Sequence, residues 1–403
     1  FNLTAIYSLN YLIGSVNRRG GIIFNPDSPL ENIPAAAHRS TFKDWHQLVD
    51  RLRWDRPKPV KMMVFFGTDP VYGLPGALDI KSAFGDTDIV SFSNFLDDTS
   101  LQADTILPIR MHLEDWGDDI PDPAPQYQTI GIQQPVVNPP PGIDVKGGFG
   151  DLLLTISEEL GGDVKSALPW KTFKDVIRST AKQLFDLDRG SVKAANFDAF
   201  WSGLLQRGGW WDIDSTTDSD IPRAPSLQDA VEPDLSGPKP GKNTFHLMPF
   251  QHVSMGDGEN AHLPWLQAVP DPISSTVWTT WVEINKKRAD ELGLIRGDEV
   301  ELRSEVGSIK ALIYPNPATP PNVLGVPLGQ GHQDLGRYSR DRGSRVSELI
   351  DPQKIDPNTG SLAWAATNVW LVKTNRHEDV PRLEGTQPAV ETHPGRIIQI
   401  SPK

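Results

Sequence analysis

The chain has no cysteine among its 403 residues. This absence excludes disulfides, thiolate-bound metals, cysteine-ligated iron–sulfur clusters and a cysteine nucleophile within the chain. Basic residues are in deficit, because 39 Lys and Arg face 52 Asp and Glu, which gives a formal net charge of −13. Nucleic-acid partners are therefore not expected, since they require a basic face. No apolar run approaches the roughly 20 residues of a membrane-spanning helix, so we expect no direct membrane span.

The common catalytic and metal-binding motifs are also missing. None of the nine His stands in HExxH or HxxxH spacing, and neither a phosphate-binding P-loop nor a Gly-x-Ser-x-Gly elbow occurs. The usual catalytic constellations are therefore weak or absent and a zinc site is not expected, so we assign no metal ligand and no catalytic residue in this chain.

The remaining composition is that of a folded protein with long loops. Hydrophobic residues make up 38% and charged residues 23%, and the length suits two or three domains. Residues 212–243 are rich in Asp, Ser, Pro and Gly, which predicts a linker and a domain boundary. Residue 1 is Phe rather than Met, so we expect a processed chain or part of a longer polypeptide.

The part before this linker has the pattern of an α/β domain. Apolar spacing predicts a buried helix over 1–16 and an amphipathic helix over 42–53. Strands and helices then alternate, which predicts a parallel sheet whose first strand is buried on both faces. Ligands of such sheets bind beyond the carboxyl ends of the strands. The expected strands are 61–67, 88–92 and 104–108, the expected helices 76–84, 94–104, 150–160 and most of 170–207, and the expected loop 119–149.

The part of the chain after the linker is predicted to consist mainly of strands. Six segments are predicted as strands, namely 244–249, 277–284, 299–304, 307–314, 323–326 and 368–374. One helix interrupts them over 285–293, with Asn285 as its N-cap and Gly293 as its stop. Six strands with one helix predict a small closed barrel.

Two clusters of candidate residues stand in the first part. Gly67, Thr68 and Asp69 follow the first parallel strand and could grip a nucleotide, although an Asx-turn starting the next helix is the simpler interpretation. Residues 112–118, which include Glu114, could form a polar pocket wall or a solvated loop anchored by Trp116.

A third cluster lies in the second part, over residues 327–338. Gly329, Gly331, His332 and Arg337 could wrap an anionic cofactor closely, or the segment could be an irregular barrel connection. Four arginines in and after this segment could bind phosphate groups or pair with acidic residues of a partner subunit: Arg337, Arg340, Arg342 and Arg345.

These motifs resemble a known family. Asp104-Thr-Ile-Leu-Pro108 with Glu114 and Gly117 is similar to the ADxxLP…E…G stretch of molybdopterin oxidoreductases of the dimethyl-sulfoxide-reductase type. Residues 283–298, followed by Ser304-Glu-Val-Gly307, resemble their molybdopterin-dinucleotide-binding barrel, which is of the double-psi type. The resemblance implies an α/β domain over 1–211 that lacks its N-terminal part and carries a helical insertion over 150–211, then a barrel over 244–403.

Further segments resemble one branch of this family, the large iron–sulfur subunit of bacterial alternative complex III. They are His112–Asp118, Gln133–Pro135, Leu263–Gln267, Pro270–Pro272, Pro327–His332, Gly336–Tyr338 and Gly360–Trp364. The resemblance implies a place on the periplasmic side of the inner membrane. The implied partners are an iron–sulfur region or subunit, a multihaem cytochrome c subunit and quinol-binding integral membrane subunits.

The resemblance implies a non-catalytic, structural role in quinol oxidation, with iron–sulfur clusters only in the adjoining region or subunit and no cofactor in this chain. Any cofactor pocket would be vestigial, and its residues would be Gly67, Thr68, Asp69, Glu114, Gly329, Gly331, His332 and Arg337. The alternative is part of an active reductase of the polysulfide or thiosulfate type. In that case Asp69, His332 and Arg337 would contact a molybdopterin dinucleotide.

Overall fold

The computed structural model describes residues 2–30, 40–54, 59–141, 147–216, 224, 226 and 234–383. The chain forms two compact units, each built from two separate segments. The first unit comprises Phe1–Arg39 and Leu107–Glu232, and the second comprises Ser40–Ile106 and Pro233–Lys403. These units differ from the linear division into 1–211, 212–243 and 244–403, because residues 40–106 pack with the barrel segment rather than with residues 107–211.

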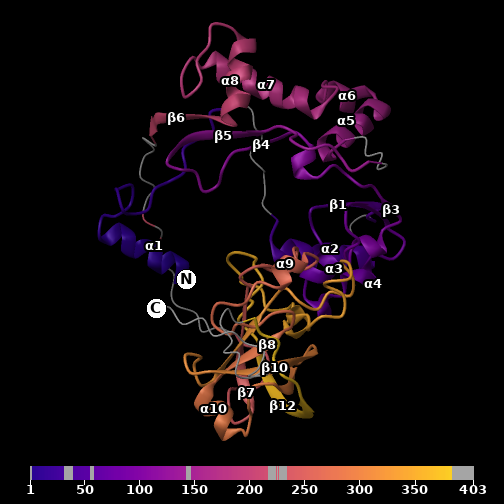
Figure 1. The fold of residues 1–403 in the computed structure, drawn as a ribbon, viewed down its shortest axis with the longest axis vertical. Helices are drawn as coiled ribbons and strands as arrows, with labels where there is room; N and C mark the ends of the chain where they lie inside the picture. The colour runs from indigo at the N-terminus through magenta and orange to yellow at the C-terminus, as the bar shows by residue number, and fades with distance from the viewer. Residues whose placement is uncertain are drawn as a thin grey trace, which may run out of the picture. The chain divides into compact units, whose positions relative to one another are not determined.

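A closed six-stranded barrel forms the larger part of the second unit (Figure 1). Its strand order is β10-β8-β11-β7-β12-β9, and β9 closes the ring by pairing antiparallel with β10. The strands are β7 (Thr244–Phe250), β8 (Trp281–Asn285), β9 (Asp298–Arg303), β10 (Ser308–Asn316), β11 (Val323–Pro327) and β12 (Asn368–His377). The predicted six-stranded barrel is therefore confirmed.

The barrel core follows from alternation along its strands. Val300 and Leu302 of β9 point inward while Glu301 between them faces outward, as expected for a sheet with one buried face. Helix α10 (Lys286–Glu291) follows β8, and the Asn285 side chain caps it by accepting a hydrogen bond from the Arg288 amide at 3.2 Å. Gly293 ends this helix with a φ of +65°, as the sequence predicted.

The other part of the second unit is a three-stranded parallel sheet of order β1-β2-β3. Its strands are β1 (Met62–Phe66), β2 (Asp88–Phe92) and β3 (Thr105–Ile106). Helix α2 (Phe42–Trp54) and the short helices α3 (Pro70–Gly73) and α4 (Ile80–Ala83) accompany it, with 3₁₀ turns at Gly76–Leu78 and Ser100–Gln102. Only this last turn forms where a helix over 94–104 was expected.

The expectation that β1 is buried on both faces is wrong. Phe65 is buried against Val49 and Leu52 of α2, but Met62, Val64 and Phe66 are about half exposed, at 56%, 51% and 47%. Successive strand residues point to opposite faces. Among the described residues, the helices therefore cover one face of the sheet and leave the other open.

The first unit contains a three-stranded antiparallel sheet, β4-β5-β6, with helices packed against it (Figure 1). The strands are β4 (Gly117–Asp119), β5 (Tyr127–Gln133) and β6 (Gly209–Thr216), and a 3₁₀ turn precedes them at His112–Glu114. The helices are α5 (Phe149–Leu160), α6 (Gly162–Ala167), α7 (Phe173–Asp186) and α8 (Phe197–Arg207). Trp210, Phe200 and Ile130 are fully buried at its centre.

Three expectations for this unit are corrected. Strand β5 forms inside the expected loop 119–149, and β6 occupies the start of the expected linker at 212–216, because they pair with each other. Residues 217–223, 225 and 227–233 of that linker lie outside the described residues. Helix α1 (Asn2–Leu12) forms, but its apolar side chains are exposed rather than buried, with Leu3 at 83% and Leu12 at 81%. Among the described residues, no other segment covers these apolar side chains of α1.

Among the described residues, no helix combines the length and the apolar character that crossing a bilayer requires.

Candidate functional site

Asp69 lies directly after strand β1, where the sequence placed a candidate site. Its side chain caps helix α3 by accepting a hydrogen bond from the Tyr72 amide at 3.3 Å. The same oxygen, Oδ1, also accepts from the Thr99 hydroxyl at 2.5 Å and from the Thr99 amide at 3.0 Å. The simpler interpretation, an Asx-turn that starts the next helix, is therefore correct, and the turn ties together the loops after β1 and β2.

Asp98 follows strand β2 and lies beside Asp69. Its backbone amide donates to Asp69 Oδ2 at 3.3 Å. Its own carboxylate is buried, and Oδ1 accepts a hydrogen bond from the Asp334 amide at 2.9 Å. The sequence analysis missed Asp98. It could have been found because it stands a few residues beyond the carboxyl end of β2, on the sheet edge that was already expected to carry ligands.

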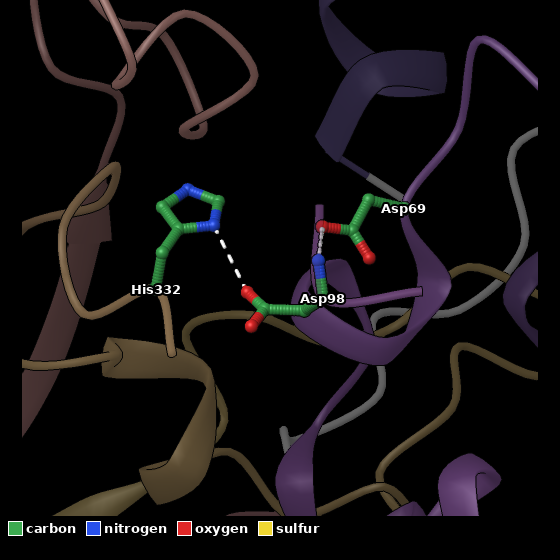
Figure 2. Close-up of side chains that lie close together, drawn as sticks. All are labelled: Asp69, Asp98 and His332. Atoms are coloured by element: carbon green, nitrogen blue, oxygen red, sulfur yellow. Dashed lines mark hydrogen bonds and ion pairs between the residues drawn. The ribbon is translucent and has the colours of Figure 1, made fainter. Parts of the chain in front are cut away.

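His332 comes from the loop after barrel strand β11 and completes the cluster. Its Nδ1 lies 3.1 Å from Asp98 Oδ2, and its Nε2 lies 3.0 Å from the carbonyl oxygen of Gly258. Figure 2 shows the imidazole turned toward the Asp98 carboxylate, and one Asp69 carboxylate oxygen bonded to the Asp98 backbone amide. A carbonyl oxygen can only accept, so Nε2 carries the hydrogen of this second bond.

Tyr72 holds His332 from the side of helix α3. The two rings are stacked, with centroids 3.5 Å apart and an interplanar angle of 13°. The Tyr72 hydroxyl donates to the Gln330 carbonyl at 3.0 Å, and the Arg345 guanidinium lies over the Tyr72 ring. His332 is only 3% exposed as a result.

Two glycines allow this close packing. Gly258 has a φ of +125°, and a Cβ there would lie 2.7 Å from the Tyr72 ring and 2.9 Å from His332 Nε2. Gly331 has a φ of +87°, and a Cβ there would overlap the backbone of Ser344 and Arg345. Both positions therefore need glycine for contacts within the chain.

Burial and neighbouring charge shift the ionisation of this cluster. Burial, together with the carboxylates of Asp97 and Asp98, raises the pKa of Asp69 above its usual value, and the hydrogen bonds from Thr99 and Tyr72 only partly oppose this. Burial also raises the pKa of the Tyr72 hydroxyl above its usual value. Burial lowers the pKa of the nearby His262, so its imidazole favours the neutral form.

The structure places the other predicted site residues less centrally. Gly67 and Thr68 are exposed at the end of β1, and Gly329 is buried. Arg337 is exposed, with its guanidinium over its neighbour Tyr338. Glu114 belongs to the first unit, where its carboxylate accepts from the Met111 amide at 3.0 Å in a capping turn.

The four arginines after β11 do not form one anion-binding patch. Arg340 bonds Asp334 at 2.5 Å, and Arg345 donates to the Leu74 carbonyl at 2.5 Å. Arg342 lies over the ring of Trp278. These side chains therefore stabilise loops of their own unit.

Comparisons with known proteins agree on one superfamily. Residues 271–367 match the family model of the molybdopterin dinucleotide binding domain. The chain is 26% identical over 370 residues to the menaquinone reductase, molybdopterin-binding-like subunit, of Nitratidesulfovibrio vulgaris. That match covers 91% of this chain and 50% of the relative, so the chain spans about half the length of the curated relative.

A solved structure has the same fold. Acetylene hydratase from Pelobacter acetylenicus superposes with a TM-score of 0.53 and 15% identity, over 81% of this chain and 46% of that one. The mixed architecture of a parallel three-stranded sheet and a six-stranded barrel is that of molybdopterin enzymes. The resemblance of this chain to the molybdopterin oxidoreductase superfamily is therefore confirmed by its sequence and by its fold.

Proposed function

We propose that this chain is a non-catalytic, structural molybdopterin-enzyme-like region of a membrane complex that oxidises quinol, of the alternative complex III type. It supports an iron–sulfur relay in an adjoining region or subunit and docks partner subunits. The observation that carries this proposal is the enclosure of His332, whose two ring nitrogens and one ring face are all engaged by its own chain.

The residues that would hold a molybdopterin dinucleotide do not fit that group as a set. His332 is buried, Gly331 packs against the backbone of Arg345, and Asp69 Oδ1 accepts three hydrogen bonds from its own chain. Only Gly67, Thr68 and Arg337 are exposed. A dinucleotide would have to displace the contacts that join the strand-end loops to the barrel loop.

The name of the curated relative supports a place in quinone-linked electron transfer. That protein is a subunit of a menaquinone reductase, and its name describes it as molybdopterin-binding-like. We propose the partners that the resemblance to alternative complex III implies: an iron–sulfur region or subunit, a multihaem cytochrome c subunit and quinol-binding integral membrane subunits. The complex lies on the periplasmic side of the bacterial inner membrane.

The deciding experiment measures molybdenum, tungsten and oxidised-pterin fluorescence in the purified assembly that contains this chain. The expected result is less than a tenth of an equivalent of metal and of pterin per chain, in a preparation that still oxidises quinol. Stoichiometric metal and pterin would contradict the proposal.

The docking role has its own test at Trp265. This side chain belongs to helix α9 (Pro264–Gln267) and is 64% exposed, and exposed tryptophans are enriched at protein interfaces. Trp265→Ala is expected to reduce recovery of partner subunits with the chain, while its thermal unfolding stays unchanged. Trp54→Ala is the matched control, because Trp54 is also exposed but lies at the end of helix α2, away from α9 in the sequence. Equal recovery for both variants and the unaltered chain would contradict docking through Trp265.

One observation favours the alternative, an active molybdopterin-dinucleotide reductase. The matched dinucleotide-binding domain is the part of the superfamily fold that holds this cofactor. The alternative requires His332 to leave Tyr72 and Asp98 so that it contacts the cofactor with Asp69 and Arg337. Stoichiometric molybdenum and pterin in the first experiment would establish it.

A further inference from the structure

Asp69, Asp98 and His332 bring three metal-ligating side chains together. One donor atom from each lies within 4.8 Å of the other two (Figure 2). The residues come from three different loops, after β1, β2 and β11. No sequence motif joins them, because Asp98 and His332 are 234 positions apart.

Hydrogen bonds to the surrounding chain hold one atom of each side chain and leave its other atom to the cluster, where His332 Nδ1 and Asp98 Oδ2 contact each other at 3.1 Å. His332 Nε2 is fixed on the Gly258 carbonyl, which leaves Nδ1. Asp98 Oδ1 is held by the Asp334 amide, which leaves Oδ2. Asp69 Oδ1 is held by Thr99 and the Tyr72 amide, which leaves Oδ2 with a single 3.3 Å bond from an amide.

This is the arrangement that orients metal ligands in proteins. A ligating imidazole usually donates its other ring N–H to a carbonyl or carboxylate, and ligating carboxylates are themselves hydrogen-bonded. The 3.1 Å between His332 Nδ1 and Asp98 Oδ2 suits two neighbouring ligands. Zinc–nitrogen and zinc–oxygen bonds of about 2.1 Å at tetrahedral or right angles place ligand atoms about 3.0–3.4 Å apart.

We propose that Asp69, Asp98 and His332 bind one divalent transition-metal ion, with Zn²⁺ as its best representative. Two carboxylates balance the charge of the ion, and the imidazole nitrogen favours Zn²⁺ over Mg²⁺ or Ca²⁺, which prefer oxygen. Asp69 is only partly buried, which gives the ion a route from solvent. The ion clamps the two strand-end loops to the barrel loop, so its role is structural.

The test uses the full 403-residue chain, stripped with a chelator and then titrated with Zn²⁺, Mg²⁺ or Co²⁺. We expect one equivalent of Zn²⁺ by calorimetry and by elemental analysis after dialysis, and a rise in Tm that saturates at that ratio. Co²⁺ is expected to give the visible absorption of a low-symmetry nitrogen- and oxygen-ligated site. Mg²⁺ is expected to bind at least tenfold more weakly.

Asp69→Asn is the decisive variant, because the amide oxygen still accepts from Thr99 while the charge is lost. It is expected to weaken Zn²⁺ binding more than tenfold and to lower the Tm of the metal-free chain only slightly, because only the 3.3 Å bond from the Asp98 amide is lost. Asp98→Asn serves as a second ligand variant, and Asp69→Asn alone decides if Asp98→Asn does not fold. His46→Gln is the matched control, since His46 lies 3.4 Å from the exposed Asp50 in helix α2, outside the cluster.

Three outcomes would overturn the metal site. They are less than a tenth of an equivalent of bound Zn²⁺, equal binding of Zn²⁺ and Mg²⁺, and equal Zn²⁺ affinity in Asp69→Asn and the unaltered chain. The metal site is tested by Zn²⁺ binding to the purified chain. The proposed non-catalytic function is tested separately, by the molybdenum and pterin content of the assembly. The two proposals can therefore fail separately.

Discussion

The imidazole of His332 is stacked on the phenol ring of Tyr72, with ring centroids 3.5 Å apart. Tyr72 belongs to the parallel-sheet segment of the second unit and His332 to its barrel segment. This stack, the hydrogen bond from the Tyr72 hydroxyl to the Gln330 carbonyl and the Asp98–His332 contact join the two segments at one place. These contacts engage both ring nitrogens and one ring face of His332.

The first prediction concerns the Tyr72 hydroxyl. Tyr72→Phe keeps the stack but leaves the buried Gln330 carbonyl without this donor, so the free energy of unfolding should fall by about 1 kcal/mol. Tyr72→Ala also removes the ring and should cost about 3–5 kcal/mol. Tyr314→Phe is the control, since its hydroxyl makes only a 3.4 Å exposed bond. Chemical denaturation measures all three, and equal losses for Tyr72→Phe and Tyr314→Phe would refute the prediction.

The second prediction concerns Gly331, and it tests whether the loop after β11 is packed against its own chain or leaves room for a ligand. Gly331→Ala should cost about 3 kcal/mol or more, because the new methyl group meets the Arg345 backbone at a positive φ. Gly336→Ala also has a positive φ but open space around it, so strain alone should cost about 1–2 kcal/mol. Thermal unfolding measures both. Similar losses at the two positions would mean that Gly331 is not tightly packed.

Asp298 gives a prediction about pH. Its burial alone raises the pKa of the carboxyl, but hydrogen bonds from Lys373, the Ile295 amide and His377 outweigh burial and lower the pKa below its usual 3.8. The stabilisation is therefore complete above about pH 4 and is lost as the pH falls through the folded-state value.

Asp298→Asn should accordingly cost about 2–3 kcal/mol at neutral pH, and progressively less as the pH falls toward about 3. Denaturant unfolding across this range measures the difference between the variant and the unaltered chain. Asp290→Asn, at an exposed carboxylate paired with Lys286, should change stability by less than about 0.5 kcal/mol throughout. If the loss of stability in Asp298→Asn did not depend on pH, the lowered pKa of Asp298 would be contradicted.

The fourth prediction tests the core of the first unit. The Arg189 guanidinium pairs with the buried Asp212 and donates to Gln128 Oε1 at 2.7 Å, and its carbonyl accepts from the Trp210 indole. A lysine ammonium cannot contact Asp212 and Gln128 together in the way the planar guanidinium does. Arg189→Lys should therefore lower the free energy of unfolding by about 1.5 kcal/mol. Arg303→Lys, in an exposed pair with Glu301, should cost less than about 0.5 kcal/mol. Equal unfolding midpoints for the two variants would count against the prediction.

The sequence predicted the candidate site only in part. Asp69 and His332 were found because one ends a parallel strand and the other stands in a glycine-rich loop. Asp98, Tyr72 and Gly258 were missed, because nothing in their local pattern shows that loops far apart in the chain meet. The Asx-turn expected at Asp69 is present as its cap on helix α3, whereas a nucleotide contact there stays a prediction.

Local alternation and capping residues determined much of the fold from the sequence alone. The strands of the barrel, Asn285 as a cap and Gly293 as a stop follow from contacts within a few residues, and so does the position of β1. Tertiary structure alone decided which faces are covered. Helix α1 and one face of β1 have the apolar pattern of core elements but remain exposed among the described residues. Burial depends on what packs against an apolar face, and periodicity within one segment carries no information about its partner.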